Sequence, residues 1–230
     1  METPFEFGAP SAEAPAIAAA EPASSLAAVH VSPAVTVQPM LVSVGMPENI
    51  TSEILPPERP VRPAVPQYIL GTGIITPEDM AAFLLNVNPE ADNLFVENLA
   101  QYYFEEAALE GVNHDVAFAQ MCLETGYLRF GNLVTPDQYN FAGLGATGPG
   151  RPGLRFPEPR VGVRAQIQHL KAYATDMPLN QELVNPRFFL VRRGSSPTIK
   201  GLAGTWAADR LYADKINNIL ERLYFFSFTN

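Results

Sequence analysis

The hydrophobic positions from residue 76 onward recur with helical spacing, and several runs begin at a residue that can cap a helix. Thr76 is followed by a proline and two acidic residues, which is typical of a helix start, and Asn88-Pro89 predicts the end of that helix. Asp92 and Asn113 predict the starts of two more helices in the same way. The expected helices cover about 77–87, 93–110, 114–124, 161–175 and 209–223, with a short one after Ser196-Pro197. The glycine- and proline-rich stretch 143–159 is expected to be a loop with at most a small hairpin, so the pattern predicts a mainly α-helical domain.

The third predicted helix is apolar on all sides, which is typical of a helix buried in a core. Residues 116–119 and 121–123 are apolar, and Gln120 interrupts them. The helix delivers Glu124 at its carboxyl end, directly before Thr125-Gly126. Burial and the negative end of the helix dipole both raise the pKa of a carboxyl placed there. Glu124 is therefore a candidate general acid, although a helix-ending glutamate that turns to solvent would have the same sequence.

The first 66 residues differ in composition from the rest of the chain. They hold 12 of the 22 prolines, 12 alanines and only two basic residues, Arg59 and Arg62. Such a segment cannot bury enough apolar surface to offset its ordering entropy, so residues 1–66 are expected to be a disordered tether. Within it, residues 29–44 alternate weakly between apolar and polar, but their prolines allow at most an edge strand. Residues 67–230 are long enough to form one domain with its own core.

The net charge of −9 argues against a general nucleic-acid binder. Residues 67–124 carry ten acidic side chains and no basic ones, whereas residues 125–230 carry seven acidic and thirteen basic ones. The basic half could face an anionic polymer, or the two halves could neutralise each other within one domain. No apolar run is long enough to span a bilayer, and no secretory signal is visible at the amino terminus. The route of export and the oligomeric state stay open.

Four blocks of the sequence resemble, in order, the blocks of one known enzyme family. The stretch GVNHDVAFAQMCLETG at 111–126 resembles the catalytic helix of that family. The stretch YNFAGLG at 139–145 resembles the turn that follows it, and VRAQIQHLKAYA at 163–174 resembles the next core helix. The stretch WAADRLYADKI at 206–216 resembles the closing block. Together the blocks cover most of the chain after residue 113, which makes the resemblance specific. The family that they resemble is that of the bacterial peptidoglycan N-acetylglucosaminidases, family seventy-three of the glycoside hydrolases.

The resemblance implies a lysozyme-like, α-rich fold with a groove for a glycan. The implied activity is that of an endo-β-N-acetylglucosaminidase, which cleaves the β-1,4 bonds of peptidoglycan strands after N-acetylglucosamine. The resemblance makes Glu124 the general acid, implies no metal and no organic cofactor, and places the protein in the cell envelope or outside the cell. Two alternatives stay open: a lytic transglycosylase that uses the same glutamate without water, and a non-catalytic wall-binding protein with a decayed site.

The same resemblance suggests residues that bind the glycan. Tyr139 and Asn140 would line the cleft near Glu124. Trp206 occupies the place of an aromatic residue near the scissile sugar, where its indole could stack on a sugar face, although members of the family often have tyrosine there. Tyr212 could instead supply the hydroxyl that such a tyrosine provides and that Trp206 lacks, or it could be a packed residue of its helix.

The second catalytic group is the weak point of this assignment, because glycosidases normally use two carboxyl groups. The glycine- and proline-rich loop offers only Glu158, and Asp137 lies just before the Tyr139 turn. No motif surrounds either residue. If neither serves, the acetamido group of the substrate is expected to act as the nucleophile.

Other candidate sites have less support. Cys122 with His114 or His169 would provide a thiol nucleophile, but a cysteine inside an apolar helix is usually a small buried residue. The three histidines lack ligand-like spacing for zinc. The stretch 143–148 matches a dinucleotide-binding fingerprint in letters, yet it neither follows a predicted strand nor opens a predicted helix.

Overall fold

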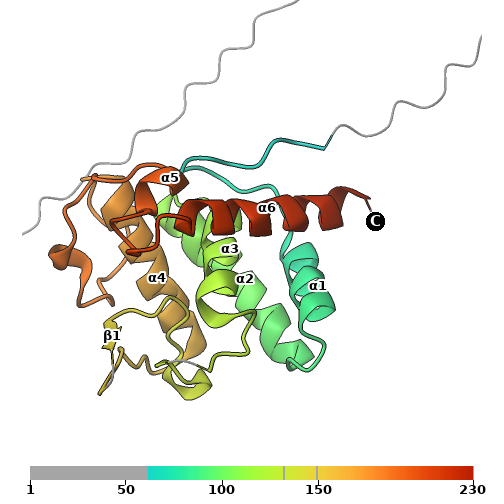
Figure 1. Cartoon of the computed structure of the whole chain (residues 1–230), viewed down its shortest axis with the longest axis horizontal. Helices are drawn as coiled ribbons and strands as arrows, with labels where there is room; N and C mark the ends of the chain where they lie inside the picture. Colours follow the sequence, from blue (N-terminus) through green and yellow to red (C-terminus); the bar gives the residue numbers. More distant parts are fainter. Residues whose placement is uncertain (1–61, 132, 149, 230) are drawn as a thin grey trace, which may run out of the picture. The chain divides into compact units, whose positions relative to one another are not determined.

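The computed structural model describes residues 62–131, 133–148 and 150–229, which fold into a mainly α-helical domain (Figure 1). The elements are α1 (Pro77–Val87), α2 (Asn93–Glu110), α3 (His114–Thr125), the 3₁₀ helix η1 (Pro136–Gln138), β1 (Ala146–Gly148), β2 (Arg151–Pro152), α4 (Pro159–Ala174), the 3₁₀ helix η2 (Phe188–Leu190), α5 (Ile199–Leu202) and α6 (Tyr212–Thr229). The expectation of a mainly α fold with a small hairpin is confirmed. No helix in this part of the chain is long and apolar enough to cross a membrane. Most of the expected tether, with the stretch 29–44, lies outside the described residues.

The capping residues start the first three helices where the sequence predicts. Thr76, Asp92 and Asn113 each accept a hydrogen bond from a backbone amide in the first turn of the helix that follows. α2 and α3 end at Gly111 and Gly126, whose φ angles of 71° and 58° lie in the left-handed region that favours glycine. The length of α3 is therefore fixed at both ends by local sequence.

Two helices differ from the sequence prediction in their boundaries. α4 begins at Pro159, slightly before the expected start at residue 161. α6 begins at Tyr212 rather than Asp209, because Asp209 forms a turn in which its carboxylate accepts from the amide of Leu211 at 2.9 Å. α6 also continues to residue 229, past the expected end, and Tyr224 in this extension is buried in the core.

α3 is the central helix of the core, as its apolar sequence predicts. Every side chain from Val116 to Cys122 is fully buried, and α2, α4 and α6 pack against this helix. α1 packs in turn against α2 and α6. Figure 1 shows α3 in the middle of the domain, with α6 crossing above it. The buried body of α3 thereby holds its last turn, which carries Glu124, in a fixed place.

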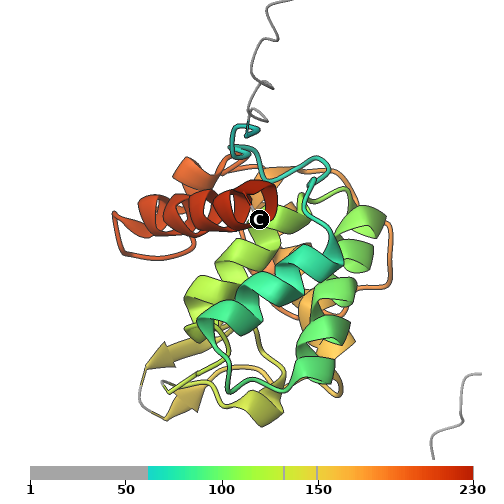
Figure 2. The ribbon, with the colours of Figure 1, turned by 90° about the vertical axis from the view of Figure 1, so that its right-hand side faces the viewer.

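A smaller cluster forms where the loop after α3 meets α4. β1 and β2 form an antiparallel hairpin there, at the opposite end of the domain from α6 (Figure 2). Gly162 on α4 allows the loop to lie directly on the helix, because a methyl group at this position would lie 1.8 Å from the carbonyl oxygen of Tyr139. This close approach positions residues 139–146 beside the end of α3. The buried residues of the cluster are Ala142, Leu144, Phe156 and Ala165.

Candidate active site

Glu124 lies in the last turn of α3, with its side chain only partly exposed. Its Oε1 atom accepts a hydrogen bond from Nε1 of Trp206 at 3.0 Å and another from the hydroxyl of Tyr212. Burial raises the pKa of the Glu124 carboxyl above its ordinary value, and the hydrogen bonds from Tyr212 and Trp206 act in the opposite direction. A carboxyl with a raised pKa holds its proton closer to neutral pH, as a general acid must.

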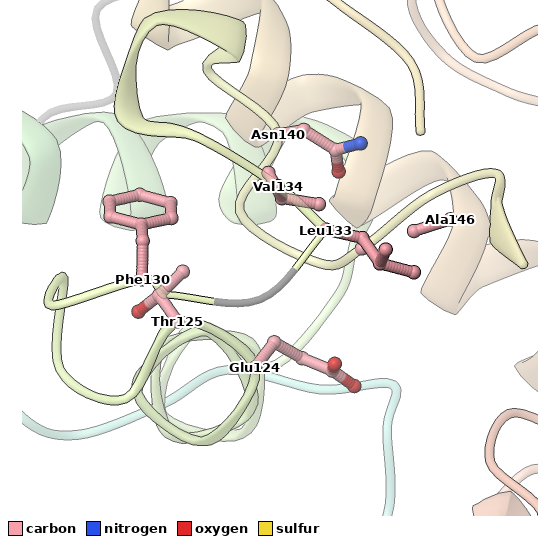
Figure 3. A pocket seen from close by; sticks show the side chains of 8 residues that line it. Glu124, Thr125, Phe130, Leu133, Val134, Asn140 and Ala146 are labelled. Carbon is pink, nitrogen blue, oxygen red and sulfur yellow. The ribbon is translucent and has the colours of Figure 1, made fainter. Parts of the chain in front are cut away.

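The Glu124 carboxyl opens into a pocket between the end of α3 and the loop that follows it. Figure 3 shows the carboxyl group pointing toward the side where Leu133 and Ala146 lie, away from Phe130. A methyl group on Gly143 would lie 3.7 Å from Oε2, so this second oxygen faces the loop across the pocket. Among the described residues that line this pocket, Glu124 carries the only carboxyl group. The lining consists of Glu124, Thr125, Phe130, Leu133, Val134, Asn140, Gly143 and Ala146.

Trp206 reaches Glu124 from the segment between α5 and α6. Its ring packs edge-on against His169, with ring centroids 5.0 Å apart at 73°, and lies 5.5 Å from the ring of Tyr173. The indole is thereby held with its N–H directed at the carboxylate. The sequence suggested a sugar-stacking role for Trp206 but gave no indication of this hydrogen bond.

Tyr212 is buried at the start of α6, and its hydroxyl lies between Glu124 and Gln120. Nε2 of Gln120 donates to the Tyr212 oxygen at 2.9 Å. The two roles considered for Tyr212, a hydroxyl in the site and a packed helix residue, are thus combined in one side chain. Sequence reasoning missed Gln120, although a single polar residue inside an otherwise apolar helix was a signal for it.

Asn140 lines the same pocket, but its side chain binds the protein backbone. Its Nδ2 donates to the carbonyl oxygens of Leu144 at 2.9 Å and Leu154 at 3.0 Å, and its Oδ1 accepts from the Leu144 amide at 2.9 Å. These bonds hold the loop that carries Gly143 against the pocket. Tyr139 is partly buried, has a left-handed φ of 50°, and packs between the main core and the smaller cluster rather than lining the pocket.

The two candidates for a second carboxyl group lie away from the residues that line the Glu124 pocket. Glu158 is exposed at the start of α4 and makes no capping hydrogen bond. Asp137 is exposed and pairs with Arg155 at 2.8 Å. Cys122, weighed as a nucleophile, is fully buried, and burial raises the pKa of its thiol far above the neutral range.

Comparison with known proteins decides the family. A family model described as mannosyl-glycoprotein endo-beta-N-acetylglucosaminidase, the glucosaminidase family, matches residues 100–225, a span that includes Glu124, Asn140, Trp206 and Tyr212. The chain belongs to the glucosaminidase family. It is therefore a glycoside hydrolase of the endo-β-N-acetylglucosaminidase type, and the family implies a peptidoglycan substrate and a place of action in the cell envelope or outside the cell. The resemblance inferred from four sequence blocks is confirmed.

Two further similarities accompany this glucosaminidase. The chain is 44% identical over 156 residues to an uncharacterized protein of Borreliella burgdorferi, a match that covers 68% of this chain and 76% of that protein. It is also similar to the crystal structure of the catalytic domain of the autolysin Auto from Listeria monocytogenes. That match has 15% sequence identity and a TM-score of 0.39, and it covers 67% of this chain and 90% of the autolysin chain.

Proposed function

We propose that this glucosaminidase cleaves the β-1,4 bonds of peptidoglycan glycan strands after N-acetylglucosamine, with Glu124 as the general acid. The observation that carries the proposal is the position of Glu124. It is the one carboxyl group among the described lining residues of its pocket, its pKa is raised by burial, and its free oxygen faces the pocket. A positioned acid of this kind typically contributes about 10²- to 10⁴-fold in rate.

In the first step, protonated Glu124 gives its proton to the glycosidic oxygen as the bond between that oxygen and the anomeric carbon breaks. The leaving sugar departs with a free 4-hydroxyl group, and positive charge develops on the anomeric carbon. Glu124 becomes a carboxylate in the same step. The Trp206 N–H and the Tyr212 hydroxyl bind a carboxylate more strongly than a neutral acid, so they favour this proton transfer.

We propose that the acetamido group of the substrate is the second catalytic group. Its carbonyl oxygen attacks the anomeric carbon as the leaving sugar departs, and the resulting cyclic intermediate is opened by water, which returns a proton to Glu124. The absence of another carboxyl group from the described pocket lining supports this choice. Under this proposal Glu158→Gln cleaves at close to the wild-type rate, whereas a loss of a hundredfold or more would make Glu158 the missing carboxylate.

Mass spectrometry of digested peptidoglycan tests which bond is cut. The proposal predicts new reducing ends on N-acetylglucosamine. Anhydro-muramyl ends would instead identify a lytic transglycosylase, and digestion without product would identify a binding protein. A sample treated with Glu124→Gln is the matched control, because it corrects for chain ends already present in the polymer.

A further inference from the structure

A second hollow lies directly beside the Glu124 pocket, along the same loop. Gly143 and Ala146 line both of them, so the two hollows adjoin the same part of the loop. We call the second one the Arg187 pocket. It is bounded by Tyr173 of α4 and by Trp206 of the segment between α5 and α6, and its described lining also includes Gly145, His169 and Arg187.

Arg187 gives this pocket a positive charge that no carboxylate neutralises within the described residues. No Asp or Glu of the described chain lies within 4.0 Å of its guanidinium, whereas Arg155, Arg160 and Arg164 each have such a partner. The residue is held in place because its backbone amide donates to Oδ1 of Asn185 at 3.0 Å. Its side chain runs along Gly145, where a methyl group would lie 3.7 Å from the Arg187 Cδ atom.

The histidine in the same pocket is uncharged at neutral pH. Burial, with the nearby charge of Arg187, lowers the pKa of His169 to about 4. Its Nδ1 atom lies 2.9 Å from Nδ2 of Asn185, so Nδ1 accepts this hydrogen bond and the ring carries its proton on Nε2. The Arg187 pocket thus combines one cation, neutral hydrogen-bonding groups and aromatic walls, which suits a sugar bearing one negative charge.

We propose that the Arg187 pocket binds a carboxylate carried by the sugar that adjoins the one at Glu124. This inference rests on the proposed function. In peptidoglycan such a carboxylate is the lactyl group of muramic acid, where the peptide has been removed, or a carboxyl group of the attached peptide. The pocket would distinguish peptidoglycan from uncharged polymers of N-acetylglucosamine.

The test measures binding, so its result does not depend on which bond is cut. Full-length Glu124→Gln protein is titrated with muramyl oligosaccharides that keep their peptides, with the same oligosaccharides after peptide removal, and with chitin oligosaccharides. Adding Arg187→Gln is expected to raise Kd about tenfold or more for at least one of the two carboxylate-bearing ligands, with chitin unchanged. The ligand that loses affinity identifies the source of the carboxylate.

Arg192→Gln is the matched control, because Arg192 is exposed nearby but does not line the Arg187 pocket. It should leave all three Kd values within about twofold. An equal loss for chitin and for the charged ligands in Arg187→Gln, or no loss for any of them, would overturn the proposal. Failure of the proposed function would appear separately, as a wild-type digest without the predicted chain ends.

A separate observation concerns a chain of buried hydrogen bonds that leads to Glu124 from the far side of the core. The Tyr103 hydroxyl donates to Oε1 of Gln166 at 2.5 Å, and Nε2 of Gln166 donates to Oε1 of Gln120 at 2.8 Å. Gln120 then donates to Tyr212, whose hydroxyl donates to Glu124. The four linking side chains come from α2, α4, α3 and α6, and all are buried.

The direction of this chain is set by a backbone carbonyl. Gln166 also approaches the carbonyl oxygen of Ala117 at 3.1 Å, and only its NH₂ group can donate there. Gln166 must therefore present its nitrogen toward Gln120, and Gln120 must present its own nitrogen toward Tyr212. Since the Tyr212 oxygen receives that hydrogen bond, its proton is directed at Oε1 of Glu124.

The indole N–H of Trp206 can act only as a donor, and it also points at Oε1. The Trp206 N–H and the Tyr212 hydroxyl thus both donate to the same oxygen of Glu124. The acidic proton of Glu124 is then left to Oε2, the oxygen that faces Gly143 across the pocket. We infer that Gln120 and Gln166 are positioning residues that hold Tyr212 as a donor and so keep the Glu124 proton on the oxygen that faces the pocket.

Gln120→Met tests this inference, because it keeps the size of the side chain and removes both of its hydrogen bonds. Tyr212 could then turn and accept the proton of Glu124 on Oε1, which favours the protonated carboxyl. The loss of kcat at high pH should move to higher pH, and kcat should fall severalfold or more. The other titratable groups around the site do not obscure this readout, because His169 and Tyr173 are both neutral near pH 7.

Gln168→Met is the matched control, since Gln168 is another fully buried glutamine on α4 whose bonds go to residues 182–185. It should lower Tm without moving the high-pH limb of kcat. If Gln120→Met does not fold, Gln166→Met provides the same test, because it frees Gln120 to turn. A folded variant with a lowered Tm that loses kcat at the same high pH as wild type would show that the buried hydrogen bonds have a purely structural role.

Discussion

At the scale of single residues, the two oxygens of Glu124 have different surroundings. Oε1 accepts from Trp206 and Tyr212, whereas Oε2 faces the pocket. The two donors stabilise the carboxylate, and burial stabilises the protonated acid. The balance between them sets how readily the acid holds its proton before cleavage and releases it during cleavage.

Trp206→Phe separates the donor from the aromatic ring. The variant keeps a ring beside His169 but loses the N–H that opposes the effect of burial on Glu124. The pKa of Glu124 should therefore rise, so the high-pH limb of kcat should move to higher pH, and kcat should fall about tenfold, as expected for a hydrogen bond to a charged group. Rates measured across pH, with Tm as the check on folding, decide the point. If kcat falls at the same high pH in the variant as in wild type, Trp206 acts on the sugar alone and not on the pKa of Glu124.

Glu124→Gln should also change the dependence of stability on pH. Because the folded-state pKa of Glu124 is raised, the native protein binds this proton more tightly than the unfolded chain does. The resulting stabilisation is fully present below the unfolded-state pKa and is lost as pH rises through the folded-state pKa. Thermal melting should give nearly equal Tm values for wild type and variant at low pH, and a higher Tm for the variant above that window. Parallel Tm curves would contradict the raised pKa.

At the scale of elements, the loop at 139–146 depends on its contact with α4. Gly162→Ala would place a methyl group against the Tyr139 carbonyl and displace the loop that carries Gly143. Overpacking of this kind typically costs about 1–3 kcal/mol, which should appear as a lower free energy of unfolding in urea. Cleavage should fall as well, because Gly143 and Ala146 line the pocket at Glu124. A variant with wild-type stability and activity would show that the loop is held elsewhere.

The helices could be predicted from sequence where local chemistry fixes their ends. Asp92, Asn113 and Gly111 set boundaries through caps that involve only near neighbours. The start of α6 could not be found in this way, because Asp209, where the helix was expected to begin, forms a turn with Leu211 and the helix begins only at Tyr212.

The site was only partly predictable for a similar reason. Sequence placed Glu124 at the end of a buried helix, and the structure agrees. Whether Tyr212 reaches Glu124, and whether Gln120 reaches Tyr212, depends on how α6 packs on α3. The sequence pattern carries no information on contacts between side chains about 90 residues apart.

At the scale of the whole molecule, the uneven charge of the chain is partly explained by pairing between α2 and α4. Glu106 of α2 is fully buried and binds Arg160 at 2.6 Å and Arg164 at 2.8 Å, and Lys171 binds Glu110 at 2.7 Å. The acidic and basic halves thus neutralise each other across this interface, which was one of the two readings of the charge pattern. Arg187 stands apart from these pairs, which is why it is a candidate for binding an anionic ligand.

The boundary of the catalytic domain remains a prediction, and truncation tests it. Removal of residues 1–61 should leave Tm and activity unchanged. Removal through residue 66 should cost slightly more, because it deletes the Arg62–Glu221 pair at 2.7 Å and the partly buried Val65. That pair is largely exposed, so its loss should cost at most about 1 kcal/mol. Aggregation or loss of the thermal transition in the first truncation would show that the amino-terminal segment is part of the domain.

The most direct test of the central claim is the rate at which Glu124→Gln cleaves peptidoglycan. Glutamine keeps the size of the side chain and can still hydrogen-bond, but it cannot give a proton to the leaving oxygen. Glu97→Gln, an exposed site on α2, is the matched control and should cleave at the wild-type rate. Glu124→Gln should melt as a folded protein and lose at least about a hundredfold in kcat. A folded Glu124→Gln protein that releases chain ends at the wild-type rate would contradict the assignment of Glu124 as the general acid.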